Sequence, residues 1–132
     1  MANEAQCIET PTRFRRYTIA DATAVPIGSI MKLSDPNTCA LSTADNDVFA
    51  GIAWEEKTLS DGITEITCAV NGIWDVTTTN AAITAGAWVS VGGANLIRAA
   101  AEADTIPGEL VGKALETCAG TEVIRVAVGE LI

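Results

Sequence analysis

Hydrophobic and polar residues alternate with a period of two along most of the chain. The clearest runs are residues 48–54, 65–70 and 123–128, where apolar side chains recur at every second position. Alternation of this kind indicates strands with one buried face. Shorter runs of the same type predict further strands at residues 29–33, 39–42, 72–78, 87–91, 95–100 and 110–117.

Short turn sequences separate these runs. They include DPNT after Leu33, the Asp-Gly pair at 61–62, the Asn-Gly pair at 71–72 and GGAN at 92–95. Asn-Gly and Asp-Gly adopt positive φ at little cost, as tight turns require. The pattern predicts an all-β fold, a small β-barrel or sandwich of about eight or nine short strands. Single helical turns are expected at most, around residues 79–86 and near residues 100–109.

The first sixteen residues follow neither period. They contain Pro11 and no sustained apolar face. We expect residues 1–16 to form an extended N-terminal arm that is mobile alone and orders against a partner. Residues 17–132 would then form a single β-barrel domain.

Charge is distributed unevenly between these two parts. The chain of 132 residues has eight Lys and Arg against seventeen Asp and Glu, a net charge of −9. Residues 1–17 carry three arginines against two glutamates, a net of +1, and residues 18–132 carry five basic against fifteen acidic side chains, a net of −10. The acidic total argues against a general nucleic-acid binder. We also expect no membrane span, because no apolar run approaches the roughly 18 residues that one needs, and no secretory signal.

The residues that usually carry chemistry are scarce. Histidine is absent, which removes the commonest general base and transition-metal ligand. The four cysteines form no CxxC pair, so buried free thiols are expected at Cys7, Cys39, Cys68 and Cys118 rather than zinc ligands or disulfides. The segment GELVGKA at 108–114 lacks the spacing and the hydroxyl residue of a phosphate-binding P-loop. We expect no metal site, no cofactor and no catalytic residues.

The three tryptophans are expected in different settings. Trp54 shares the apolar face of its run, so we expect it in the core rather than as a sugar platform beside Glu55 and Glu56. Trp74 shares a face with Val76 and is also expected in the core. Trp88 alternates against apolar neighbours and is expected to point outward, either as a binding or subunit-contact anchor or under a loop of its own chain.

The order of the segments resembles the small capsid decoration, or cement, proteins of tailed bacteriophages. The similarity covers roughly residues 20–132 and lies in turns and strand cores rather than in catalytic signatures. The matching segments are Gly28, the GIA segment at 51–53, the GIWDV segment at 72–76, ITAGAWV at 83–89, GKALE at 112–116 and IRVAV at 124–128.

This resemblance implies a β-barrel that binds the outside of an assembled phage head, after synthesis in the host cytoplasm. Its partner would be the major capsid protein, and a homotrimer or cluster at a capsid symmetry axis is the expected assembly. The protein would stabilise the capsid lattice without performing catalysis.

The basic cluster near the N-terminus then acquires a candidate role. We expect the arm to lie on the capsid surface, with the arginines facing carboxylates and the aromatic rings supplying buried area, since Arg and aromatic residues are enriched in interface hot spots. The alternative is a solvated leader that only aids solubility. The candidate partner-binding residues are Arg13, Phe14, Arg15, Arg16, Tyr17 and Trp88.

Two other functions remain open. A receptor- or glycan-binding knob or fibre module on the virion would use Trp88 and the acidic loops. A small hydrolase would need two carboxyl groups that converge in one cleft with separated pKa values, and no spacing in the sequence places two acids together in an apolar setting.

Overall fold

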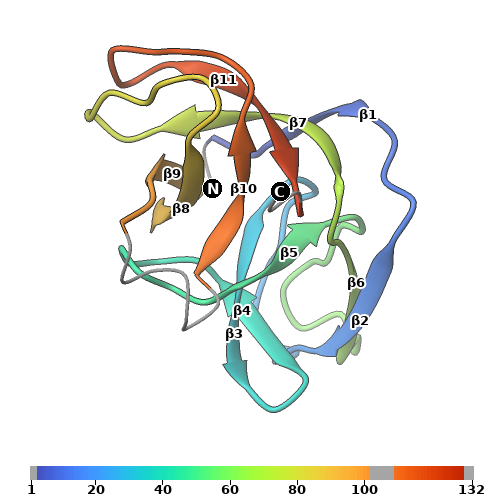
Figure 1. Cartoon of the computed structure of the whole chain (residues 1–132). Helices are drawn as coiled ribbons and strands as arrows, with labels where there is room; N and C mark the ends of the chain where they lie inside the picture. Colours follow the sequence, from blue (N-terminus) through green and yellow to red (C-terminus); the bar gives the residue numbers. More distant parts are fainter. Residues whose placement is uncertain (1–2, 102–108, 130–132) are drawn as a thin grey trace.

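A computed structural model describes residues 3–101 and 109–129 of the chain, and these residues contain strands and no helix (Figure 1). No helix long and apolar enough to cross a membrane occurs within those ranges. The strands are β1 (Gln6–Glu9), β2 (Phe14–Thr18), β3 (Ile30–Asp35), β4 (Thr38–Leu41), β5 (Phe49–Ala53), β6 (Glu65–Ala69), β7 (Gly72–Thr78), β8 (Trp88–Gly93), β9 (Leu96–Ala99), β10 (Leu110–Ala114) and β11 (Val123–Val128).

The strands form two small barrels. In the first barrel, strands β2 to β6 close in the order β2-β4-β3-β5-β6. In the second barrel, strands β7 to β11 follow the order β7-β11-β10-β8-β9, and a parallel pairing between β7 and β9 closes the ring. The first barrel closes in the same way, through a parallel pairing of β2 with β4. Each barrel is therefore made by five consecutive strands connected in the same order.

The two barrels also repeat their turn and bridge contacts. An isolated antiparallel bridge joins Val25 to Lys57 in the first barrel, and another joins Ile83 to Cys118 in the second. The β3–β4 and β8–β9 turns each contain an asparagine at positive φ, 52° at Asn37 and 57° at Asn95. The chain is thus an internal repeat with a period of about 60 residues.

A glutamate that follows the fourth strand of each barrel makes the same contact. Glu55 Oε1 accepts a hydrogen bond from the main-chain N–H of Thr67 at 2.7 Å. Glu116 Oε1 accepts one from the main-chain N–H of Arg125, also at 2.7 Å. Each carboxylate accepts from a main-chain N–H that the bend after the fourth strand leaves unpaired. Both barrels therefore use a glutamate at the same position for the same hydrogen bond.

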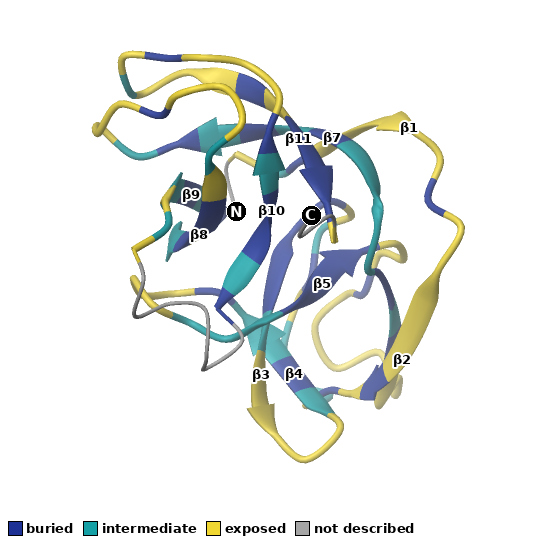
Figure 2. Cartoon of the chain, in the orientation of Figure 1, coloured by how far each residue is buried: buried dark blue, intermediate teal, exposed yellow. Residues whose placement is uncertain are grey.

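Two apolar cores lie inside the barrels. One fills the first barrel and contains Tyr17, Ile19, Val25, Met31 and Ile66 among its members. The other fills the second barrel and extends to Ile30, Ile52 and Ala69 of the first. Because these three side chains belong to the first barrel, the barrels share one buried contact and pack as one unit (Figure 2).

The all-β prediction is confirmed, and all nine predicted strands are present as β3 to β11. The expected helical turn at 79–86 is wrong, because Ile83 forms a β-bridge there instead. The other expected helical turn, near residues 100–109, lies largely outside the described residues.

The prediction of a separate, unpaired arm at residues 1–16 is wrong for the residues of this segment that the structure describes. Strand β1 pairs antiparallel with β7, and β2 pairs with β6 over five residues. Figure 2 shows β1 and most of β2 in the exposed colour, and only Tyr17 of β2 is buried. These strands were missed because they are held by main-chain pairing and bury almost no alternating apolar side chains.

Candidate partner-binding surface

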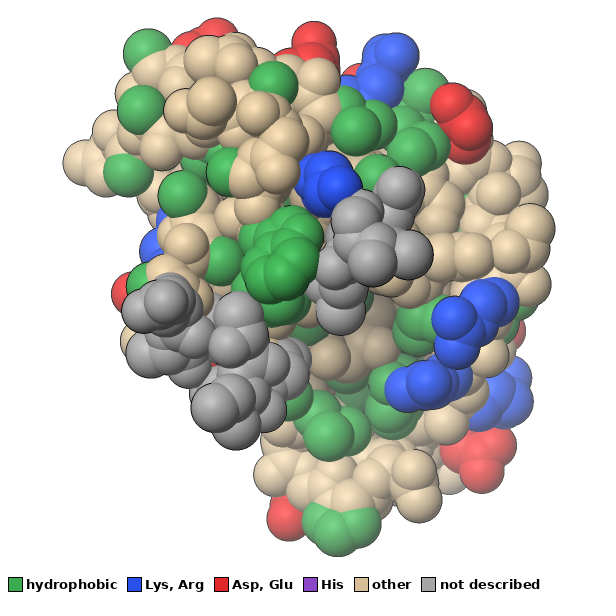
Figure 3. All heavy atoms as spheres, in the orientation of Figure 1, with side chains coloured by type: hydrophobic (Ala, Val, Ile, Leu, Met, Phe, Trp, Pro, Cys, Tyr) green, Lys and Arg blue, Asp and Glu red, His purple; other side chains and the backbone are tan. Residues whose placement is uncertain are grey.

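Strand β2 carries the basic cluster on the outside of the first barrel. Arg13 lies just before the strand, and Arg15 and Arg16 lie within it, all exposed. Figure 3 shows Lys and Arg side chains gathered on the side of the molecule where Figure 1 places β2. The cluster therefore sits on a paired strand of a closed barrel, so its main chain is fixed in position.

The two aromatic residues of the cluster point in opposite directions. Phe14 is 43 % exposed, and its ring lies 5.4 Å from the ring of Trp54 in a tilted arrangement. Tyr17 is buried, and its hydroxyl donates a hydrogen bond to the carbonyl oxygen of Ala50 at 2.8 Å. Burial raises the pKa of Tyr17, and Arg15 offsets this only in part. Phe14 is available to a partner, whereas Tyr17 anchors β2 to the core.

The arginines differ in how far their charge is already neutralised. Arg16 lies 3.2 Å from Glu65 and 3.6 Å from Glu55, and its guanidinium donates to Thr67 Oγ1 at 2.8 Å. These side chains are about half exposed, so each ion pair contributes only ~0.2–1 kcal/mol. Within the described part of the chain, Arg13 and Arg15 form no ion pair. Their charges remain available to an acidic partner.

Trp54 does not lie in the core, and that prediction is wrong. Strand β5 ends at Ala53, so the alternation on which the prediction rested stops one residue earlier. The Trp54 side chain is 37 % exposed and lies between Phe14 and Trp74, with its ring centroid 6.0 Å from that of Trp74 in an edge-to-face arrangement. Trp74 is buried as expected and donates from Nε1 to the carbonyl oxygen of Asn71 at 3.0 Å. The three rings form a row from the surface into the second barrel.

An open depression of about 740 Å³ lies beside this row of rings, and the N-terminal segment forms part of its wall. Its wall includes Ala5, Cys7, Ile27, Trp54 and Trp74. Asp75 also lines it, but that carboxylate is paired with Arg125 at 3.3 Å. Glu4 lines the depression too, so its surface is mixed, apolar at the rings and polar along the N-terminal segment. The described residues contain no group of three or more Cys, Asp or Glu that could hold a metal ion.

Trp88 points outward, as expected. It begins β8, is 39 % exposed and lies opposite Lys113 of β10. Because β8 belongs to the second barrel, the structure does not bring Trp88 together with the β2 cluster (Figure 1). The two parts of the predicted site are separate surfaces.

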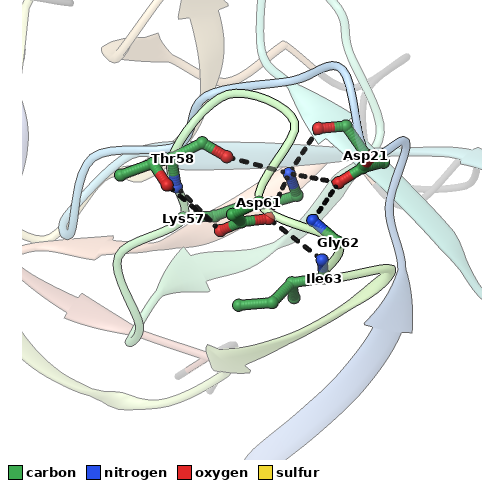
Figure 4. Close-up of polar contacts among 6 residues, drawn as sticks. All are labelled: Asp21, Lys57, Thr58, Asp61, Gly62 and Ile63. Carbon is green, nitrogen blue, oxygen red and sulfur yellow. Dashed lines mark hydrogen bonds and ion pairs between the residues drawn. The ribbon is translucent and has the colours of Figure 1, made fainter.

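A buried lysine that the sequence analysis did not single out fixes the loop after β5 (Figure 4). The Lys57 side chain is 1 % exposed, and its Nζ donates to the carbonyl oxygen of Asp21 at 2.6 Å and to Asp61 Oδ1 at 3.1 Å. Asp61 in turn accepts from the main-chain N–H groups of Thr58 and Ile63. Lys57 therefore holds the 58–63 loop against the first barrel, and its position four residues before Asp61 was the only signal in the sequence.

Three of the four predicted buried thiols are confirmed. Cys39, Cys68 and Cys118 are buried, and all four cysteines are free. A hydrogen bond with the Cys39 side chain, together with burial, raises the pKa of Cys68. The prediction for Cys7 is wrong, because this residue lies on the outermost strand, β1, and is exposed.

Comparison with protein-family models finds no family that matches this chain, and a search of curated proteins finds no matching sequence.

Proposed function

We propose that this protein is a structural virion protein that binds the outer surface of a bacteriophage head and stabilises the capsid lattice. The observation that carries the proposal is the exposed group of Arg13, Phe14 and Arg15 on a paired strand of a closed barrel. The resemblance to decoration proteins in residues 20–132 supports it, since the matching segments form the strands and bends of both barrels.

The electrostatics of the chain fit binding in one orientation. The body carries most of the acidic residues, whereas β2 presents positive charge that is not fully paired. A partner surface rich in carboxylates attracts the β2 side and repels the rest of the molecule, which favours one orientation over others. Phe14 and the exposed edge of Trp54 would then supply apolar area at the centre of the contact.

The partner in this proposal is the major capsid protein, and the assembly is a homotrimer or a cluster at a symmetry axis. Trp88 is the candidate anchor for contacts between neighbouring copies, because it is exposed on the second barrel, away from β2. In this arrangement one barrel binds the shell and the other binds its neighbours.

A glycan-binding module on the virion is the second candidate. It is favoured by the exposure of Trp54 beside the exposed residues Glu55 and Glu56. Against it, one side of the Trp54 ring lies near Phe14 and another near Trp74, so little of its face is open for stacking on a sugar. A glycan array probed with the purified protein tests this candidate. The glycan-binding function predicts that the wild type binds at least one glycan and that Trp54→Ala abolishes this binding.

The test of the main proposal is reconstitution on particles that lack the protein. Virions from the source of this chain would be depleted of it, incubated with purified protein, and separated by sedimentation. We expect the wild-type protein to sediment with the particles and the R13Q/R15Q variant to bind at least ~10-fold more weakly, which corresponds to about 1.4 kcal/mol. The control R98Q/R125Q removes the same charge from the second barrel and is expected to bind as the wild type does. Equal binding by all three proteins would contradict the role of β2.

A further inference from the structure

The two barrels differ at one strand edge. In the second barrel, the edge of β7 that closes onto β9 is covered at its N-terminal half by β1, which pairs with Ile73 to Asp75. In the first barrel, β2 takes the place of β7, and it meets β4 only at Thr18. No strand of the described chain pairs with the N-terminal half of that β2 edge.

The hydrogen bonds of β2 identify which main-chain groups lie on this edge. Ile19 donates to Thr64 at 2.9 Å, and Arg13 accepts from Val70 at 3.1 Å. Thr18 faces the other way and donates to Asn37 at 2.8 Å. Since main-chain groups alternate sides along a strand, those of Phe14 and Arg16 point away from β6, toward the edge that lacks a neighbour.

The surface beside this edge is open and positively charged. A depression of about 440 Å³ borders it, lined by Arg15, Arg16, Tyr17, Leu33 and Asn37. Leu33 is 42 % exposed there. Side chains of an added strand would therefore find an apolar contact at Leu33 and arginines on both faces of β2.

We propose that the β2 edge at Phe14–Arg16 accepts an extended acidic segment of a partner protein as an added antiparallel strand. The chain itself provides the precedent, because β1 occupies the equivalent edge of β7 in the antiparallel direction. Unpaired strand edges bind extended peptides through main-chain hydrogen bonds, with side chains adding selectivity. Here the selectivity comes from charge, since Arg13 and Arg15 form no ion pair within the described residues. The inference concerns the mode of binding and does not depend on the partner being a capsid protein.

The test uses the full chain, labelled with ¹⁵N, and the peptide acetyl-TEVEVET-amide at low ionic strength. We expect millimolar binding, with amide shift changes that centre on Phe14 and Arg16, and slower hydrogen exchange at these two amides in the complex. The peptide acetyl-TKVKVKT-amide has the same strand tendency and opposite charge, and it is expected not to bind.

Two matched variants separate main-chain pairing from charge. R16P removes the edge N–H and leaves the β6 ladder intact, whereas R16A removes the same side chain and keeps the N–H. We expect R16P to bind the acidic peptide at least ~10-fold more weakly than R16A. If R16P does not fold, the pairing is tested from the peptide side with two peptides, N-methylated at the central glutamate or at the valine that follows it. Each lacks one main-chain N–H, and the peptide whose missing N–H faces β2 cannot donate to a β2 carbonyl oxygen, so it should bind more weakly by a similar factor.

Several results would overturn the inference. One is binding of the lysine peptide as tightly as the acidic peptide, and another is equal affinity of R16P and R16A for the acidic peptide. The others are amide shift changes that centre on β1 and β7, and no binding of the acidic peptide at ~5 mM. Failure of this experiment would leave the particle-binding assay unaffected, because a capsid contact through side chains alone needs no added strand.

Discussion

Gly28 and Gly86 provide a controlled experiment within one chain. They occupy equivalent places in the two barrels, and their φ angles are 91° and 90°. The main-chain N–H of Gly28 donates to Ala53, and that of Gly86 donates to Ala114, which ends the corresponding strand. The two sites differ in their surroundings, because the N-terminal segment lies over Gly28 and no described residue lies over Gly86.

The size of that difference can be worked out from the structure. Among residues 3–101 and 109–129, a Cβ at Gly86 would meet no atom within 4 Å beyond its chain neighbours, whereas a Cβ at Gly28 would lie 2.3 Å from the carbonyl oxygen of Ala5. Alanine at positive φ costs roughly 1–2 kcal/mol at either site. The reduced entropy of the unfolded chain offsets about 0.4–1 kcal/mol of this. We therefore expect G86A to lower the free energy of unfolding by about 1 kcal/mol.

G28A must also displace the N-terminal segment. This breaks the hydrogen bond from the Ala5 N–H to the Gly28 carbonyl oxygen, which is 2.8 Å long, and exposes the buried Ala5 methyl. The bond contributes ~0.5–1.5 kcal/mol and the methyl about 0.8 kcal/mol. G28A should therefore lower the free energy of unfolding by about 1.5–2 kcal/mol more than G86A does.

Urea unfolding followed by tryptophan fluorescence measures both variants. The same pair is then made in a chain that begins at Thr10 and lacks β1. There the two substitutions should have equal effects to within ~0.5 kcal/mol, because the atom that Gly28 must avoid is gone. Equal effects in the full chain would refute the account of how the N-terminal segment packs, as would a difference that persists in the shortened chain.

Three further outcomes follow from buried and exposed side chains. Lys57→Met should lower the free energy of unfolding by about 2–4 kcal/mol, because it removes the charged hydrogen bonds from Lys57 to Asp21 and Asp61. Urea unfolding measures this change, and a loss under ~1 kcal/mol would contradict the role of these hydrogen bonds. For Asp61, burial acts to raise the pKa, but hydrogen bonds from Ile63, Lys57 and Thr58 outweigh it and lower the pKa. The wild type should therefore exceed Asp61→Asn in free energy of unfolding by the largest amount above pH ~3.9, the pKa of Asp in the unfolded chain, and this difference should shrink as the pH falls below that value. A difference that stays constant from about pH 7 to about pH 2.5 would contradict the lowered pKa of Asp61. In thiol labelling of the native protein, Cys7 should react and the other three cysteines should react only after unfolding, so labelling of all four in the native state would be inconsistent with the described burial.

The strands that bury alternating apolar side chains were predictable from the sequence. Strands β7 and β11 show why, because Trp74 and Val76 of β7, like Ile124, Val126 and Val128 of β11, enter the core at every second position and the pattern follows directly. Strands β1 and β2 were not predictable in this way. Their pairing depends on main-chain groups that every residue has, and β1 has no buried side chain to mark it.

The internal repeat was also not evident from the sequence. The equivalent positions agree at scattered sites, several of which have a local structural role, as with Asn37 and Asn95 or Glu55 and Glu116. Elsewhere each barrel fills its core differently. Lys57 in the first barrel stands where the second has Cys118, so a buried ion-pair network replaces a small thiol at the same bridge.

The residue types of the candidate surface were predictable from the sequence, but the directions in which its aromatic side chains point were not. Three arginines and two aromatic residues within five positions indicated a contact surface, and the structure places Phe14 and the arginines on the outside. The inward turn of Tyr17 and the exposure of Trp54 depend on where β2 crosses the barrel and where β5 ends. Both are tertiary features that local patterning does not contain.

The central claim, that this chain binds a phage head, is tested most directly by counting it on particles. Virions purified from the source of the chain would be analysed by quantitative mass spectrometry, with the major capsid protein as the internal standard. The account predicts hundreds of copies per particle, held in a stable ratio to the capsid protein. Complete absence from intact virions would contradict it, and a handful of copies would instead place the chain in a tail, fibre or receptor-binding structure.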